Sequence, residues 1–236
     1  MKQTRILVLG TGTGIGKTFV SRCLVRARPE VAGLKPIESG VSAEGLRAGR
    51  GEDGASIGSA RFLVPPAPYL FVEPVSPHLA AALEGRSIDV GILREWLSRV
   101  RVAESGEPPR ALLVESAGGA FSPLSQDLFN ADLATQLEVD RVVLVAPNRL
   151  GVLHDVAATL LALAVRVGRT PDCLILNECD AADLRDRSRP SNLRELGALL
   201  ERLAPNCRLF PFRRNAEPTE PEPGAIWRLL LAECFT

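Results

Sequence analysis

The chain has 236 residues, 46% of them hydrophobic, and its 28 basic and 28 acidic residues give a formal net charge of zero. This length and composition allow a single α/β domain over residues 1–236 to bury a full core without a metal or disulfide. The balanced charge provides no basic footprint for nucleic acid, so we expect no nucleic-acid partner.

Six short runs rich in Val, Leu and Ile are predicted strands, and they lie at 5–10, 31–36, 110–116, 141–147, 172–178 and 207–212. Most are continuously apolar, as strands buried on both faces are. Segments of helical period separate them, at 18–27, 77–83, 88–102, 132–138, 153–167, 192–203 and 224–234. The alternation predicts a three-layer α/β fold, with a mostly parallel central sheet and helices on both faces.

Three polar stretches interrupt this pattern. Residues 42–54 and 183–190 are rich in Gly, Arg and Asp, and we interpret them as poorly ordered loops or lids of a site. Residues 217–224 form a proline-stiffened connector before the last helix.

Cysteine usage and hydropathy indicate the compartment. The five cysteines are scattered and contain no Cys-x-x-Cys pair, which favours reduced thiols over a disulfide framework or a zinc site. The N-terminus enters a strand almost at once, and no apolar run approaches the roughly 20 residues of a membrane helix. We therefore expect a cytoplasmic protein with no signal peptide and no membrane attachment.

The stretch ILVLGTGTGIGKTFV, residues 6–20, joins the first strand to the first helix. Its glycines recur at every second position, so the spacing does not fit the G-x-G-x-x-G fingerprint of dinucleotide sites. The strict phosphate-loop spelling requires glycine where Thr11 stands. A strand, Gly-Lys-Thr and a helix in this order still favour a loop of the P-loop NTPase type over a ligand-free turn.

In such a loop, Lys17 would neutralise the outer phosphates of a nucleotide and Thr18 would bind Mg²⁺. Successive backbone amides would turn inward through the glycines. The residues predicted to bind the nucleotide here are Gly12, Thr13, Gly14, Ile15, Gly16, Lys17, Thr18 and Phe19.

Polar residues follow three other strands, and ligands collect at the carboxyl ends of parallel strands. In GLKPIESG, Lys35 is either a solvated surface charge or a group that neutralises a transferring phosphoryl group. In VESAGGAFSPLS, Glu115 is either a turn residue or a Mg²⁺ ligand. In LILNE, the amide of Asn177 is able to pair with a base edge. Each of these residues alone is better explained as structural, but their occurrence together favours a functional site.

These segments, with YLFVEPVSPHLAA and NRLG, resemble the dethiobiotin synthetase family, in the same order and over roughly residues 5 to 212. The resemblance implies a homodimeric, ATP- and Mg²⁺-dependent ligase that closes a cyclic urea on diaminopelargonic acid with CO₂. It implies a carbamate on one amine, attack of the carbamate on the γ-phosphate, and ring closure by the second amine with release of phosphate.

The resemblance also implies residue roles. Lys17 and Lys35 correspond to the phosphate-neutralising pair, while Thr18, Asp53 and Glu115 correspond to Mg²⁺ ligands. Asn177 would read adenine. The remaining implied contacts are Thr11 and Ser39 near the diamine and its carbamate, Glu115 and Gly118 near the nucleotide, and Leu150 and Gly151 near the substrate, the last two from the partner subunit.

Some positions depart from the family pattern, whose loop reads G-T-D-T-x-V-G-K-T. Gly12 replaces the aspartate and Gly14 stands at the x position. The family segment K-L-G-x-x-N-H is here RLGVLHD, with His154 and Asp155 at a predicted helix start. We interpret Asp155 as a helix cap, because an acidic side chain suits that end of a helix.

Other functions remain open from the sequence. A nucleotide-switch ATPase of the partitioning or septum-positioning type shares the predicted fold, but its signature lysine would stand at Gly12. A ligase acting on another amine or carboxylate, as the corrinoid amidating synthetases do, lacks here the glutaminase half that it needs. A degenerate relative would bind nucleotide without turnover.

Overall fold

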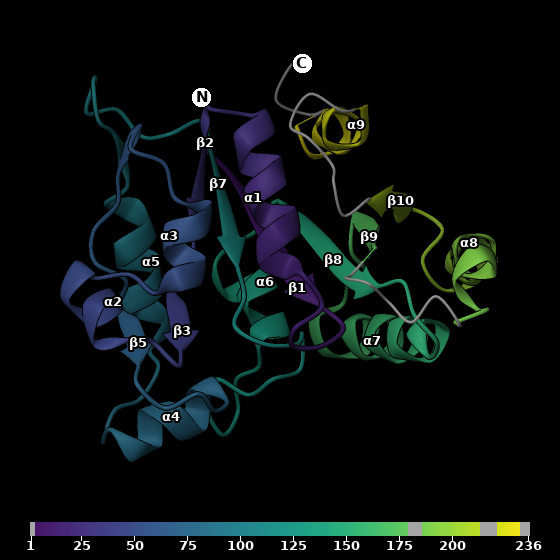
Figure 1. The fold of residues 1–236 in the computed structure, drawn as a ribbon, viewed down its shortest axis with the longest axis horizontal. Helices are drawn as coiled ribbons and strands as arrows, with labels where there is room; N and C mark the ends of the chain where they lie inside the picture. Colours follow the sequence, from purple (N-terminus) through teal and green to yellow (C-terminus); the bar gives the residue numbers. More distant parts are fainter. Residues whose placement is uncertain (1–2, 179–185, 213–220, 232–236) are drawn as a thin grey trace.

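The structure, a computed structural model, describes residues 3–178, 186–212 and 221–231. Its centre is a six-stranded parallel sheet with the strand order β10-β9-β8-β1-β7-β2 (Figure 1). The strands are β1 (Thr4–Gly10), β2 (Val31–Leu34), β7 (Ala111–Glu115), β8 (Arg141–Pro147), β9 (Cys173–Asn177) and β10 (Arg208–Phe212). Each coincides with a predicted strand, with small differences at the ends.

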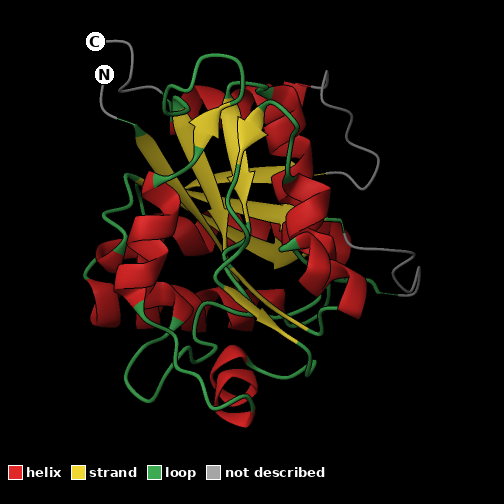
Figure 2. Cartoon of the chain, turned by 90° about the vertical axis from the view of Figure 1, so that its left-hand side faces the viewer, coloured by secondary structure: helices red, strands yellow, loops and turns green. Residues whose placement is uncertain are grey.

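Helices cover both faces of this sheet (Figure 2). Ile6 and Val8 of β1 enter one apolar cluster, and Leu7 and Leu9 enter another on the opposite face. The first cluster includes residues of α1 (Lys17–Ala27) and α9 (Pro221–Leu230), and the second includes residues of α5 (Val90–Ser98), α7 (Val152–Val167) and α8 (Arg189–Leu203). The predicted three-layer α/β fold is therefore confirmed.

The long connection between β2 and β7 lies beside the β2 edge of the sheet (Figure 1). It contains the helices α2 (Ala43–Ala48), α3 (Glu52–Ile57), α4 (Pro77–Leu83) and α5. It also contains two small strand pairs, β3 (Ile37–Ser39) with β5 (Tyr69–Phe71), and β4 (Phe62–Leu63) with β6 (Arg101–Val102). Helix α3 packs against α1 and β2, which brings this connection close to the first loop.

The prediction that residues 42–54 are poorly ordered is wrong, because they form α2 and the start of α3. Ser42 caps α2 by accepting a hydrogen bond at Oγ from the Gly45 amide, 3.1 Å away. Gly49, with φ 69°, ends the helix in the left-handed conformation. Good capping thus makes short helices from a polar, glycine-rich stretch.

Two other helices are shorter than predicted. The helix expected over 88–102 ends at Ser98, and Val102 instead pairs with Phe62 between β4 and β6. The helix expected over 132–138 is the single turn α6 (Leu133–Gln136) after a 3₁₀ turn at 130–132. Glu138, with φ 51°, ends that segment.

Parts of the remaining predictions lie outside the described residues. Residues 183–185, 217–220 and 232–234 are among these, while α8 already begins at Arg189 and α9 at Pro221. The described cysteines Cys23, Cys173 and Cys207 are buried and form no disulfide with one another. Within the described ranges, no helix combines the length and the apolar character needed to cross a bilayer.

Helix α3 approaches the backbone of β2 closely at Gly33. A Cβ atom at this position would lie 2.4 Å from the carbonyl oxygen of Ile57 and 3.0 Å from Cγ2 of Val25. Only glycine allows this approach, so Gly33 sets how near α3 lies to the sheet.

We expect Gly33→Ala to lower the free energy of unfolding by about 1–3 kcal/mol, because overpacking must displace α3. Gly197→Ala is the matched control. Gly197 lies inside α8 with nothing within 4 Å of its missing Cβ, so alanine there should stabilise by about 0.5–1 kcal/mol. Urea denaturation measures both. Equal midpoints for Gly33→Ala and the wild type would contradict the close approach.

Candidate active site

Backbone hydrogen bonds join the loop after β1 to β8 on one side and to the segment after β7 on the other. The Thr11 amide donates to the carbonyl of Val145 at 3.0 Å, and the Ala120 amide donates to the carbonyl of Gly10 at 2.7 Å. Gly14 and Gly16 have φ values of 69° and 88°, and Gly16 is the N-cap of α1. A glycine loop that opens a helix in this way presents backbone amides and the helix dipole to an anion.

Lys17 folds back along this loop. Its side chain passes Gly10, where a Cβ would lie 2.9 Å from Cδ of Lys17, and its Nζ donates to the carbonyl of Gly12 at 3.0 Å. The pKa of Lys17 is lowered to about 8, chiefly by burial and then by the charge of Lys35, while the carboxylates of Glu115 and Asp53 partly offset this effect. A phosphate placed beside Nζ would favour the charged form of this lysine.

Lys35 is the centre of a buried charge cluster. Its Nζ donates to Oε1 of Glu115 at 2.6 Å and lies 3.3 Å from Oδ2 of Asp53. Thr18 donates from Oγ1 to the same Glu115 oxygen at 2.8 Å. Burial alone would lower the pKa of Lys35, but Glu115 and then Asp53 outweigh burial and raise that pKa above its ordinary value. Thr18, Lys35, Asp53 and Glu115, from separate parts of the chain, thus meet in one cluster.

Buried oxygen atoms in this region lack hydrogen-bond partners among the described residues. They include Oε2 of Glu115, beside the lysine cluster, and the hydroxyl oxygens of Thr11 and Ser39. Because buried polar atoms are normally paired, these atoms point to contacts with a ligand.

A hollow of about 400 Å³ lies next to the cluster. Its polar lining consists of Thr13, Lys35, Glu38, Ser39, Asp53, Ser76 and Ser122, and Gly118 lies at its wall. Pro74, Val75, Pro77 and Ala117 complete it. Hydroxyls, one lysine and two carboxylates suit a small polar substrate better than an apolar one.

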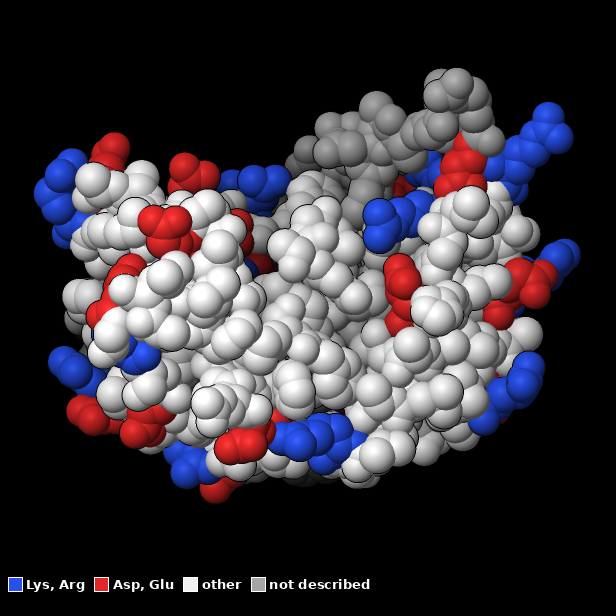
Figure 3. Space-filling view, turned by 90° about the horizontal axis from the view of Figure 1, so that it is seen from below, with Lys and Arg blue, Asp and Glu red and all other residues white. Residues whose placement is uncertain are grey.

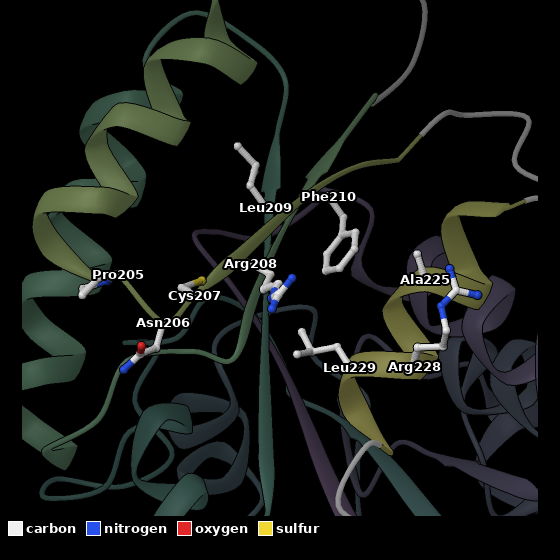
Figure 4. A pocket seen from close by; sticks show the side chains of 9 residues that line it. All are labelled: Pro205, Asn206, Cys207, Arg208, Leu209, Phe210, Ala225, Arg228 and Leu229. Atoms are coloured by element: carbon white, nitrogen blue, oxygen red, sulfur yellow. The ribbon is translucent and has the colours of Figure 1, made fainter.

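A wider groove of about 790 Å³ lies elsewhere, between β10 and α9 (Figure 4). Its lining includes Cys207, Arg208, Phe210 and Arg228, and it contains no residue of the glycine loop. Size alone would select this groove. We place the site at the smaller hollow, because the charge cluster and the loop meet there.

Asn177 lies on the other side of the loop from Glu115, since β9 and β7 flank the central pair β8 and β1. Its side chain is buried, and its Nδ2 donates to the carbonyl of Ile15 at 2.9 Å. Phe19 packs edge-on against Phe212, with ring centroids 6.0 Å apart. Asn177 therefore supports the loop in this structure, whereas Phe19 packs α1 against β10.

Leu150 and Gly151 are not among the described residues that line the hollow. They precede α7, where Gly151 is the N-cap and Leu150 is 78% exposed. The interpretation of Asp155 as a cap is wrong. Asp155 lies within the first turn of α7, no side chain of the described residues caps that helix, and the Asp155 carboxylate lies 3.9 Å from the Arg149 guanidinium. His154 is exposed.

A family model described as an AAA domain matches residues 4–203. An ATP-dependent dethiobiotin synthetase from Anaeromyxobacter sp. (strain Fw109-5) is 33% identical, over 90% of this chain and 92% of that protein. The chain belongs to the dethiobiotin synthetase family. A Salmonella typhi relative of the same name is 37% identical over 71% of this chain and 73% of its own, and one from Aromatoleum aromaticum is 33% identical over 89% and 92%.

Two further residues of this family member shape the site and were missed by the sequence reasoning. Asn130 is fully buried, and its Nδ2 donates to the carbonyls of Ala117 and Gly119 at 2.6 and 3.0 Å. Ser122 accepts from the Gly119 amide at 2.9 Å. Ser122 stands inside the VESAGGAFSPLS motif, which was a usable signal, whereas Asn130 follows no pattern in the sequence.

The cluster leads to a stability prediction. We expect Lys35→Met to lower the free energy of unfolding of the nucleotide-free protein by about 3–5 kcal/mol, because Glu115 keeps its burial and loses its cation. The double variant Lys35→Met/Glu115→Gln should recover part of this loss. Urea denaturation of the single and double variants measures the coupling between the two side chains.

The control is Arg194→Met, whose pair with Glu195 is formed by side chains that are 81% and 44% exposed. Loss of such a surface pair costs at most about 1 kcal/mol. If Lys35→Met were no more destabilising than this control, the two buried charges would not be coupled.

Proposed function

We propose that this chain forms dethiobiotin from diaminopelargonic acid and CO₂, with hydrolysis of ATP to ADP and phosphate. Family membership gives the reaction class. The observation that carries the proposal is the convergence of Lys17 and Lys35 with the glycine loop, beside a hollow lined by hydroxyls. Phosphoryl transfer to a carbamate needs this arrangement of positive charge more than it needs a strong base.

The nucleotide lies along the loop, with its phosphates on the amides of residues 12–19 and its base toward β9. This orientation follows from the sheet order, which places Asn177 and Glu115 on opposite sides of the loop. Lys17 neutralises the outer phosphates, and Gly118 leaves room for Ser122, whose Oγ would lie 2.7 Å from a Cβ at position 118. Asn177, at the end of β9, contacts adenine.

Thr18, Asp53 and Glu115 are the residues that would hold Mg²⁺. All three offer oxygen atoms, Glu115 and Asp53 both lie against Lys35, and Oε2 of Glu115 has no hydrogen-bond partner among the described residues. In the described part of the chain, no three or more His, Cys, Asp and Glu side chains form a group suited to a metal. One or two carboxylates, a hydroxyl and phosphate oxygens are what Mg²⁺ usually takes. When bound, it would neutralise charge on the phosphates.

The diamine occupies the hollow that Ser39 lines, and Thr11 of the glycine loop is a further proposed contact. One amine adds CO₂ and loses a proton to form a carbamate. A carbamate oxygen attacks the γ-phosphorus, and the bond from that phosphorus to the ADP oxygen breaks. The second amine then attacks the carbamoyl carbon, loses a proton and expels phosphate. Lys35 stabilises the negative charge on the transferred phosphoryl group throughout.

The assay for this function measures phosphate release with and without diaminopelargonic acid. We expect release only with the diamine, and a loss of about 10²–10³-fold in kcat for Lys17→Met, since one charge-stabilising group is removed. Arg194→Met, on the exposed face of α8, should leave the rate unchanged. Diamine-independent hydrolysis would support a switch ATPase, and nucleotide binding without turnover would support a degenerate relative.

The enzyme acts as a homodimer in the cytoplasm, and an exposed face of α7 supports the dimer. Leu153, Leu161 and Val165 on this helix are 38%, 55% and 89% exposed, and Leu150 directly precedes it. Figure 3 looks onto the underside of Figure 1, where α4 and α7 lie, and charged side chains gather mainly around the rim of this face. An exposed apolar row suits a second copy of the chain, which would bring Leu150 and Gly151 to its partner.

We expect the double variant Leu161→Glu/Val165→Glu to be monomeric in light scattering, because buried carboxylates would face each other across the two-fold axis. Leu63→Glu is the control, since Leu63 is 59% exposed on β4, away from α7. This control should keep the mass of the wild type. A monomeric wild type, or an unchanged mass in the double variant, would contradict the dimer through α7.

A further inference from the structure

Glu38 is a buried carboxylate in the wall of the hollow that the function above leaves without a role. It lies in β3, between Lys35 and Ser39, and is 8% exposed. Its Oε1 accepts from the Asp53 amide at 2.9 Å, and its Oε2 accepts from the Gly54 amide at 3.1 Å. Both oxygens are therefore bound to the first turn of α3.

The N-cap position of α3 is built to admit this carboxylate. Gly51 stands there without a capping side chain, and its missing Cβ would lie 2.3 Å from Cδ of Glu38 and within 2.5 Å of both oxygens. Any other residue at position 51 would push the carboxylate away. Glu38 and Gly51 thus form one unit, in which a remote side chain replaces the usual N-cap.

The residue held in place by this unit is Asp53. Its own amide is bonded to Glu38, its side chain is 42% exposed, and its carboxylate lies 3.3 Å from Nζ of Lys35. Lys35 in turn bonds Glu115, which accepts from Thr18. We propose that Glu38 is a positioning residue, which fixes the first turn of α3 so that the Asp53 carboxylate faces Lys35 and Glu115. The inference rests on the role proposed above for Asp53 in holding Mg²⁺.

The test compares Glu38→Ala with Glu38→Gln by two readouts other than turnover. Hydrogen exchange of the Asp53 and Gly54 amides in the metal-free protein reports the two bonds. Electron paramagnetic resonance of free Mn²⁺ in the presence of ADP reports metal affinity. We expect Glu38→Ala to speed both amides at least about tenfold and to weaken Mn²⁺ binding by about 10–100-fold, as loss of a group supporting a metal ligand does.

Glu38→Gln, which keeps one acceptor oxygen, should weaken Mn²⁺ binding less than Glu38→Ala does. Gly51→Ala should act in the same direction as Glu38→Ala, and it serves if Glu38→Ala does not fold. The matched control is Ser42→Ala, which removes the cap of the neighbouring helix α2 and should leave Mn²⁺ affinity within about twofold.

Faster exchange of the two amides with Mn²⁺ affinity unchanged would overturn the inference, because Glu38 would then only stabilise α3. Unchanged exchange would overturn it as well, because the two bonds would be absent. If the wild type showed no diamine-dependent turnover while Mn²⁺ binding still fell in Glu38→Ala, the proposed reaction would fail and the positioning role would stand.

Discussion

The buried ion pair between Lys35 and Glu115 is the contact on which the rest of the site depends. It joins the exits of β2 and β7, and the hydroxyl of Thr18 at the start of α1 binds the same Glu115 oxygen. Removing two such charges from water is costly unless further groups satisfy them. The Ser116 carbonyl and Asp53 do so for Lys35, at 3.0 and 3.3 Å. The pair therefore fixes where the surrounding loops lie.

Around Lys17, the cluster combines a second lysine, Lys35, with the carboxylates of Glu115 and Asp53 before any ligand arrives. Lys17 is the less well compensated cation, since its Nζ donates to a carbonyl and burial lowers its pKa to about 8. Lys35 is held charged by its carboxylate neighbours. A triphosphate beside the loop would complete the partners of Lys17, and a divalent cation would offset its remaining negative charge. The two lysines thus differ: carboxylates already compensate Lys35, whereas a phosphate would be the main anionic partner of Lys17.

The sequence predicts the sheet well because short, continuously apolar runs are typical of strands that are buried on both faces. Glu115 and Lys35 followed from their positions after strands, and the parallel sheet brings such positions to one edge. Helix α3 was missed because its cap is Glu38, more than ten residues upstream and in another element. Asn130 was missed for the same reason, because only the tertiary fold brings it to the two carbonyls to which its side chain donates. Local patterns do not contain such contacts.

The two unusual glycines of the loop have different physical meanings. Gly14 has φ 69° with nothing within 4 Å of its missing Cβ, so the backbone conformation, and not crowding, favours glycine there. Gly12 is not in the left-handed region, and a Cβ there would lie 3.7 Å from Cγ2 of Ile15, an ordinary contact. A side chain at position 12 therefore fits the loop. Neither crowding nor a left-handed backbone therefore requires glycine at position 12, whereas the left-handed backbone of the loop favours glycine at position 14.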